Sequence, residues 1–254
     1  MNNYRKSMKN LNFDPDFSEK TIRLLNSYTD TVVSETKQSP VRKYGRILLV
    51  AAALTAVLTP VAFAAVQLLT PSQVANHFDD EKLADAFESD KALIVNEEKT
   101  VGEYTITLSG VVSGVDVADI LGEEDAVSDY VVVAVRYTDG RAIVQDETWE
   151  SDPIFRFTVS PYVHGRTPSE VNLFSLESRA SKCVVGNVLY ILLETDKLEA
   201  FYDTTLYLGV VESDTMAHIV NDERCPFALA DNGEIVMKEQ WNEDAACVLF
   251  ELPM

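Results

Sequence analysis

The stretch Tyr130–Tyr137, YVVVAVRY, decides the fold class of this chain. It consists mainly of valine and tyrosine, which favour β-strands, and Asp139-Gly140 directly after it indicates a turn. Similar runs recur along the chain between turn residues. The strands expected on this basis are Tyr104–Leu108, the region of Val111, Tyr130–Tyr137, Ile154–Val159, Lys182–Val185, Val188–Leu193, Thr205–Val211 and Cys247–Leu252. This pattern predicts a mainly β, antiparallel β-sandwich over about residues 90–254. Residues 213–243 remain open between strand and helix.

Upstream of these strands, the charge of the chain reverses across an apolar segment. Residues 1–46 carry a net charge of +4, residues 47–254 carry −24, and the whole chain carries −20. Between the two charged parts, Ile47–Leu69 contains 23 residues without a charge, which is long enough for a helix to span a hydrocarbon core of about 30 Å. Because basic flanks stay inside, we expect a cell-membrane protein with a cytoplasmic N-terminus and an extracytoplasmic C-terminal domain. The acidity of that domain argues against nucleic acid as a partner.

The apolar segment also has features of a cleaved signal peptide. Ala62-Phe63-Ala64 followed by Ala65 resembles a signal-peptidase site, and the stretch Ile47–Leu58 has the length of a signal-peptide core. A 46-residue leader is long for a signal peptide, however, and apolar residues continue to Leu69. We therefore expect an uncleaved transmembrane helix at 47–69, with cleavage after Ala64 as the alternative.

The cytoplasmic leader, residues 1–46, contains one expected amphipathic helix from Asp16 to about Glu35. Its apolar side chains fall at helical spacing and form one stripe. The stripe comprises Phe17, Leu24, Leu25, Tyr28 and Val32. A single helix of this length is marginal in water without a packing partner. These five residues are therefore the candidate partner-binding residues, and the alternative is a frayed tail before the anchor.

A juxtamembrane helical segment is expected at 70–89. Thr70 is placed as an N-cap, Pro71 as the first helical residue, and Gln73 as the residue that closes a capping box. Val74 and Phe78, followed by Leu83, Ala84 and Phe87, supply an apolar face. Because Asp79 and Asp80 interrupt this face, the segment forms either one helix or two short ones.

Several stretches of the outer part resemble a known family. They are EYTITLSGVVSG (Glu103–Gly114), YVVVAVRYTDG (Tyr130–Gly140), FTVSPYVHG (Phe157–Gly165), NVLYILLETD (Asn187–Asp196), LYLGVVES (Leu206–Ser213) and LFELP (Leu249–Pro253). The order of these stretches after the apolar segment resembles single-pass membrane proteins of Gram-positive, often clostridial, bacteria that carry an uncharacterised extracytoplasmic domain, some of them labelled anti-sigma factors. The resemblance implies an immunoglobulin-like outer domain. It also makes a sigma factor, or another cytoplasmic protein, the candidate partner of the leader.

Residues that could carry chemistry are sparse. The chain has no nucleophile elbow, zinc-protease helix, phosphate-binding loop or dinucleotide fingerprint. The three histidines, His77, His164 and His218, lack the spacing of metal ligands. A catalytic triad of His164 with Ser160 and an Asp is not expected. The leader contains neither His nor Cys, so it lacks the zinc module of zinc-binding anti-sigma factors. We expect no catalytic residues, no cofactor and no metal, and hence a protein that is not an enzyme.

Two acidic clusters and three cysteines complete the candidate residues. Asp79–Glu81 and Glu123–Asp125 could collect Ca²⁺, but neither follows a calcium-loop pattern, so solvated acidic surfaces are expected. Cys183 and Cys247 lie in apolar runs and are expected in the core, whereas Cys225 beside Pro226 is expected to be the most exposed. One disulfide is compatible with the predicted compartment, but we expect none to form.

These features leave three classes of function. The first is a membrane-anchored regulator, anti-sigma-factor-like, whose leader binds a cytoplasmic partner while the outer domain senses or docks an unknown extracellular ligand. The second is a cell-surface binding or structural module whose leader does little. The third is a secreted hydrolase, which no motif supports. The apolar stripe of the leader favours the first class.

Overall fold

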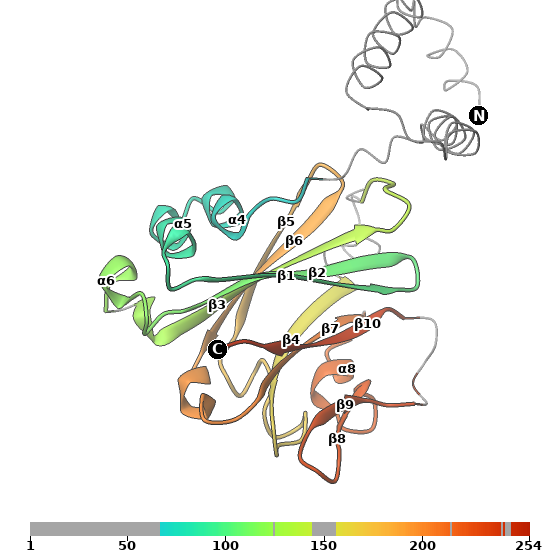
Figure 1. The fold of residues 1–254 in the computed structure, drawn as a ribbon. Coiled ribbons are helices and arrows are strands. Elements are labelled where there is room, and N and C mark those ends of the chain that lie inside the picture. The colour runs from blue at the N-terminus through green and yellow to red at the C-terminus, as the bar shows by residue number, and fades with distance from the viewer. Residues whose placement is uncertain (1–66, 124, 144–155, 214, 240, 242–244) are drawn as a thin grey trace, which may run out of the picture. The chain divides into compact units, whose positions relative to one another are not determined.

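The computed structural model describes residues 67–123, 125–143, 156–213, 215–239, 241 and 245–254. These residues belong to one compact unit of the chain. Among these residues there are two main antiparallel β-sheets and a small two-stranded sheet, accompanied by the short helices seen in Figure 1. The helices of the described part are α4 (Pro71–His77), α5 (Glu81–Glu88), α6 (Ala118–Leu121) and α8 (Ala217–Val220), with 3-10 turns η1 (Asp125–Val127) and η2 (Leu198–Phe201). The strands are β1 (Leu93–Val101), β2 (Tyr104–Ser113), β3 (Ser128–Tyr137), β4 (Phe157–Val163), β5 (Arg179–Val185), β6 (Val188–Asp196), β7 (Leu206–Glu212), β8 (Phe227–Leu229), β9 (Ile235–Met237) and β10 (Cys247–Leu252).

The larger sheet has five strands in the order β1-β2-β3-β6-β5, and the smaller one has three in the order β10-β7-β4. All pairings within both sheets are antiparallel, which confirms the predicted mainly β, antiparallel character. The expected strand at Ile154–Val159 was placed too early, because the observed strand β4 runs from Phe157 to Val163. Pro161 lies inside it, and as an edge strand β4 tolerates a residue without an N–H.

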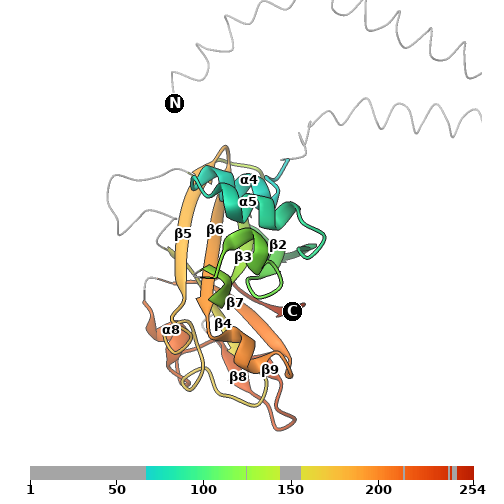
Figure 2. The same ribbon diagram turned by 90° about the vertical axis from the view of Figure 1, so that its left-hand side faces the viewer.

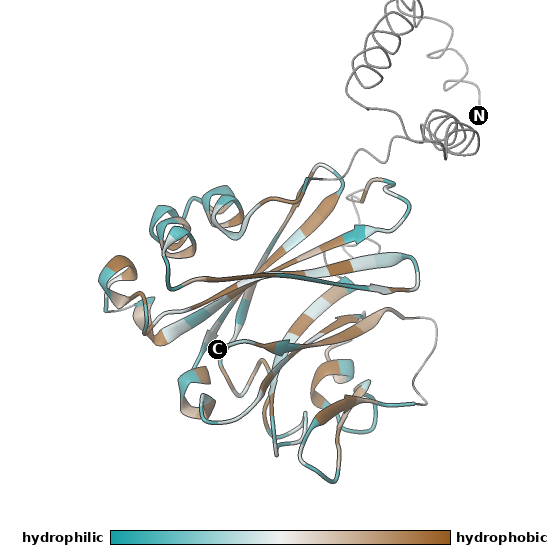
Figure 3. Cartoon of the chain, in the orientation of Figure 1, coloured by the Kyte–Doolittle hydropathy of each residue, from teal (hydrophilic) through white to brown (hydrophobic). Residues whose placement is uncertain are grey.

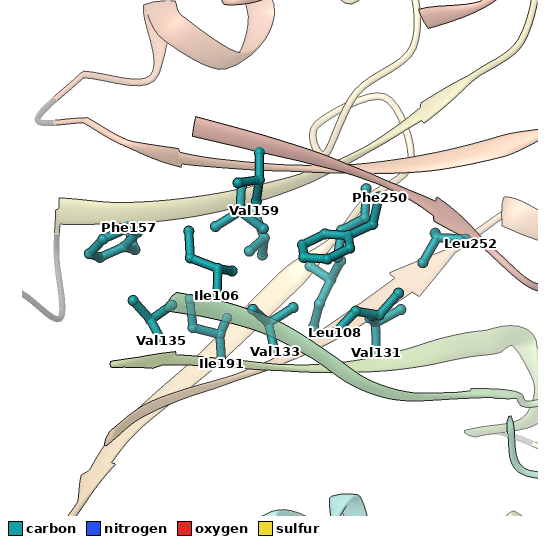
Figure 4. Close-up of a cluster of buried hydrophobic side chains, with 14 of the residues drawn as sticks. Ile106, Leu108, Val131, Val133, Val135, Phe157, Val159, Ile191, Phe250 and Leu252 are labelled. Atoms are coloured by element: carbon teal, nitrogen blue, oxygen red, sulfur yellow. The ribbon is translucent and has the colours of Figure 1, made fainter. Parts of the chain in front are cut away.

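The two sheets face each other across a central core of branched aliphatic and aromatic side chains. The ten labelled residues of Figure 4 belong to it: Ile106, Leu108, Val131, Val133, Val135, Phe157, Val159, Ile191, Phe250 and Leu252. Each sheet contributes every second side chain along its strands to this core, and the side chains of the two sheets point toward one another. Burial of such apolar area, at about 25 cal/mol per Å², is the main favourable term in folding.

Helices α4 and α5 cover the outer face of the five-stranded sheet, as Figure 2 shows. The prediction of a helix start is confirmed, since the Thr70 side chain accepts from the Gln73 N–H and the Gln73 side chain accepts from the Thr70 N–H. Of the two alternatives for this segment, the structure has the two short helices. A second cluster, the helical cluster, lies between the helices and the sheet. Its buried members are Val74, Ala75, Leu83, Ala84, Ala86, Phe87, Val112, Val117, Leu121, Tyr130, Val132, Ala134, Val188, Tyr190 and Leu192.

An insertion between β7 and β10 covers the outer face of the three-stranded sheet. This is the segment that the sequence left open between helix and strand, and it contains α8 and the two-stranded sheet of β8 and β9. A third cluster, the insert cluster, fixes it to the sheet. Its buried members are Tyr162, Tyr207, Val211, Ile219, Cys225, Phe227, Ile235 and Cys247. Because both sheets are covered on their outer faces, apolar residues recur along the strands in Figure 3 without strict alternation.

Strand β1 was not predicted from the sequence. It forms an edge of the five-stranded sheet, and most of its side chains are exposed or half-buried. Its pairing with β2 shifts between Ile94 and Glu97, where Asn96 has a left-handed backbone with φ of 53°. Such a bulge twists an edge strand and disfavours pairing with a second chain.

Candidate functional site

The five candidate partner-binding residues lie outside the described residues, so their role stays a prediction. They are Phe17, Leu24, Leu25, Tyr28 and Val32. Of the expected transmembrane segment, the structure describes only Gln67, Leu68 and Leu69. Within the part of the chain that the structure describes, no helix is both long and apolar enough to cross a membrane.

The histidines lie in three separate places. His77 is exposed at the end of α4 and makes an edge contact with Phe78. His164, directly after β4, lies close to Gly233, which belongs to the turn between β8 and β9. Ser160, the serine of the triad that the sequence did not favour, is completely buried, and its hydroxyl accepts from the Leu173 N–H. The Ser160 hydroxyl therefore stabilises the chain around Leu173.

A serine–histidine contact does occur, at a position that the sequence did not single out. The Ser213 hydroxyl lies 2.7 Å from Nδ1 of His218 and also accepts from the Thr215 N–H at 3.0 Å. The imidazole packs edge-on against Trp241, whose indole N–H donates to the carbonyl of Arg224. A catalytic serine needs a base that a third group orients for proton transfer. Here the contacts fix a turn and the start of the insertion, which is a structural role.

An extensive polar network surrounds Glu212, at the end of β7. Glu212 is 7% exposed, and its carboxylate accepts from the Tyr104 hydroxyl at 3.0 Å and from the Ala246 N–H at 3.2 Å. It also forms an ion pair with Arg156 at 2.6 Å. Burial, together with the hydrogen bond to Tyr137, raises the pKa of Tyr104 above its ordinary value, so the hydroxyl remains a donor. The network ties β2, β4, β7 and β10 together.

Aromatic and cationic groups extend this network to the surface. The ring of Tyr104 stacks on Tyr137 at 4.8 Å and meets Phe157 edge-on at 4.9 Å. Arg141 lies over the Tyr137 ring at 3.8 Å and pairs with Glu103. An isolated sequence gives little sign of this cluster, because its members are far apart in the chain. An acidic residue at the end of an apolar strand, as at Glu212, is the one available signal.

A second network lies at the opposite end of the strands, around Asp129. Asp129 is 2% exposed, and its carboxylate accepts from the Tyr202 hydroxyl and from the Gly114 N–H. Burial raises the pKa of Asp129, and the hydrogen bond from Tyr202 partly opposes that rise. The Tyr202 hydroxyl also lies 2.8 Å from that of Ser113. This network joins the turn after β6 to β2 and β3.

Two lysines bridge the sheets along their sides. The Lys99 ammonium on β1 donates to the carbonyl of Leu249 on β10, and lies over the Phe250 ring. On the other side, Lys182 on β5 donates to the carbonyl of Phe157 on β4. Burial lowers the pKa of Lys182. Both lysines hold edge strands of different sheets together.

The expectation for Cys225 was wrong. Cys225 is completely buried, 3.7 Å from the Tyr162 hydroxyl, because the insertion folds back onto the sheet. Cys247 is buried as expected, and Cys183 is the most exposed of the three. All three are free thiols, and burial raises the pKa of each, that of Cys247 to about 11. A raised pKa keeps the thiols protonated and unreactive.

Among the described residues, no group of three or more His, Cys, Asp or Glu side chains is placed to hold a metal ion. Comparison of the chain with family models, with curated proteins and with solved structures finds no match. The polar groups described above hold strands, turns and the insertion in place.

Proposed function

We propose that the chain is a single-pass, membrane-anchored regulator, anti-sigma-factor-like, with its C-terminal domain outside the cell membrane. The observation that carries the proposal is the reversal of charge, from +4 to −24, on the two sides of an uncharged 23-residue segment. The leader binds a cytoplasmic partner such as a sigma factor through Phe17, Leu24, Leu25, Tyr28 and Val32. The outer domain senses or docks an extracellular ligand.

The order of the strands supports an immunoglobulin-like fold for the outer domain. In a constant-type immunoglobulin domain, strands A, B, E and D form one sheet, and strands C, F and G form the other. Strands β2, β3, β6 and β5 have the first order, and β4, β7 and β10 have the second. On this assignment β1 is an additional edge strand, and α8 with β8 and β9 is an insertion between F and G. Domains of this architecture serve many binding functions, so the fold alone does not name a ligand.

The topology is tested with protease added outside intact cells. We expect loss of the acidic part from residue 70 onward and protection of the leader. Recovery of a soluble protein that begins at Ala65 would instead establish the signal-peptide alternative.

The regulatory role is tested in the leader. Leu24→Asp combined with Leu25→Asp places two charges in the proposed interface, each of which costs several kcal/mol if it is buried without a partner. Transcription of the targets of the partner sigma factor should rise, while membrane insertion stays normal. The matched control, Glu19→Ala with Asp30→Ala, changes the polar side of the same helix and should have little effect.

The alternative is a cell-surface binding or structural module with no regulatory leader. It would be favoured if the double Asp variant left every transcript unchanged and the leader captured no sigma factor.

A further inference from the structure

The way the chain enters the described domain fixes how much of the apolar segment is free to cross a membrane. Leu68 and Leu69 are half-buried against the helical cluster, and the Leu69 N–H donates to the Tyr190 hydroxyl at 2.8 Å. The capping box at Thr70 and the helix from Pro71 follow immediately. The chain is therefore fixed to the domain from Leu68 onward.

This attachment leaves residues 47–66 for the span. A helix of 20 residues would measure about 30 Å, which matches the thickness of a hydrocarbon core. Only Gln67, which is exposed, remains as a connection between the span and the domain. A domain with so short a connection must rest directly on the lipid headgroups.

The entry point also identifies the part of the domain that faces the lipid. Tyr190 lies near the start of β6, and the turn between β5 and β6 consists of Gly186 and Asn187. The Asn187 amide donates to the carbonyl of Gly140, which follows β3, so the turn and the end of β3 form one corner. In Figure 1 the chain joins the domain beside the ends of β5 and β6 that form this turn.

The distribution of charge agrees with this orientation. Among the described residues, the charged groups at this corner are Asp139 and Glu103, and both are paired with Arg141. The opposite ends of the strands carry acidic residues in the connections after β2 and β6. These residues include Asp116, Asp119, Glu123, Asp125, Glu199 and Asp203, together with Asp196, which is paired with Arg179 at 3.1 Å. A membrane surface that carries anionic lipid repels such residues within a Debye length of about 8–10 Å, and it repels the corner less because the corner has fewer unpaired carboxylates.

We propose that the β5–β6 turn and the adjoining end of β3 form a surface that rests on phospholipid headgroups, with the acidic end of the domain directed away from the membrane. This inference rests on the proposed function, because it requires the anchor at 47–66. It adds the side of the domain that the membrane occupies, and hence the side that is left for a ligand.

The test uses the full chain reconstituted in liposomes whose phosphatidylcholine carries a nitroxide on the headgroup. A fluorophore is attached through Asn187→Cys or Thr138→Cys at the corner, and through Asp203→Cys or Asp119→Cys at the acidic end. All four variants carry Cys183→Ser, and the buried Cys225 and Cys247 stay in place. We expect quenching at the two corner positions to be at least threefold stronger than at the two distal ones. Equal quenching, or stronger quenching at the acidic end, would overturn the proposal.

A second variant tests whether the short connection sets this orientation. Twelve Gly and Ser residues inserted between Val66 and Gln67 leave the packing of Leu68 and Leu69 unchanged but add about 19 Å of flexible chain. The ratio of quenching at the corner to quenching at the acidic end should then fall to less than half its value. An unchanged ratio would contradict the argument. Flotation of each preparation with the liposomes separates the two proposals. A chain that does not float refutes the anchor and this surface together. A chain that floats but is quenched equally at the corner and at the acidic end refutes the surface alone.

Discussion

Gly209 on β7 makes room for the insertion that covers the three-stranded sheet. A Cβ added at this position would lie 2.4 Å from Cε2 of Phe227 and 2.6 Å from Cε2 of Tyr162. Both rings are completely buried, and their centroids are 5.4 Å apart. The Tyr162 hydroxyl in turn donates to the carbonyl of Ile219 on α8. A side chain at residue 209 must therefore push the rings that hold the insertion.

The cost of Gly209→Ala follows from these distances. Carbon atoms prefer a separation of about 3.5–4.0 Å, so both contacts are too short by about 1 Å or more. Overpacking of a buried site costs about 1–3 kcal/mol, and two clashes with fixed rings place this variant at about 2–3 kcal/mol. For a domain of this size the melting temperature should fall by about 4–12 °C.

The assay is urea unfolding of the full chain in detergent, followed by the fluorescence of Trp241 in a Trp149→Phe background. Phe227→Leu removes the closer of the two clashing atoms, so Gly209→Ala should cost at least 1 kcal/mol less in that background than alone. Gly165→Ala is the matched control. Its left-handed φ of 77° and open surroundings predict a conformational cost of about 1 kcal/mol, with no coupling to Phe227. A Gly209→Ala variant within about 0.5 kcal/mol of the parent, or additive with Phe227→Leu, would refute the reasoning.

Three further predictions concern the helices and the buried carboxylate. Thr70→Ala removes the cap of α4 and should lower the unfolding free energy by about 1 kcal/mol, with faster hydrogen exchange in that helix and unchanged exchange in β4. Leu83→Ala opens a cavity in the helical cluster and should cost about 2–5 kcal/mol in urea unfolding; a smaller loss would mean that α5 is only loosely packed. Because burial raises the pKa of Asp129, the folded protein binds this proton more tightly than the unfolded chain. Its unfolding free energy must then fall as the pH rises from the ordinary aspartate pKa through the raised one. Asp129→Asn should remove that part of the pH dependence, and identical slopes for variant and parent between pH 4 and 8 would contradict the raised pKa.

The sequence predicted the strands whose side chains are mostly buried, since burial selects the β-branched and aromatic residues that mark a strand. Strand β3 is the clearest example, with YVVVAVRY inside the observed Ser128–Tyr137. Strand β1 was missed for the opposite reason. An edge strand buries few side chains, so Asn96–Lys99 can be polar and charged without loss of stability.

The layers could be predicted less well than the strands. A continuous apolar run shows that a strand is covered on both faces, but it does not identify the segments that cover it. The start of helix α4 could be predicted because its capping residues, Thr70 and Pro71, are adjacent to the helix in the sequence. Strands β8 and β9 have three residues each, and their position depends on how Phe227 packs against Gly209. The network at Glu212 likewise depends on residues more than 100 positions apart, such as Tyr104.

The coverage of the sheets restricts where the described domain can bind a ligand. Many sandwich domains use the flat face of a sheet for binding, but here α4 and α5 occupy one outer face and the insertion occupies the other. The edges are also engaged, because Lys99 and Lys182 bridge strands of opposite sheets. The ends of the strands are then the principal surfaces left, and on our proposal the corner at Asn187 faces lipid. A search for the ligand should therefore begin at the opposite end, around α6 and the turn that contains Asp203.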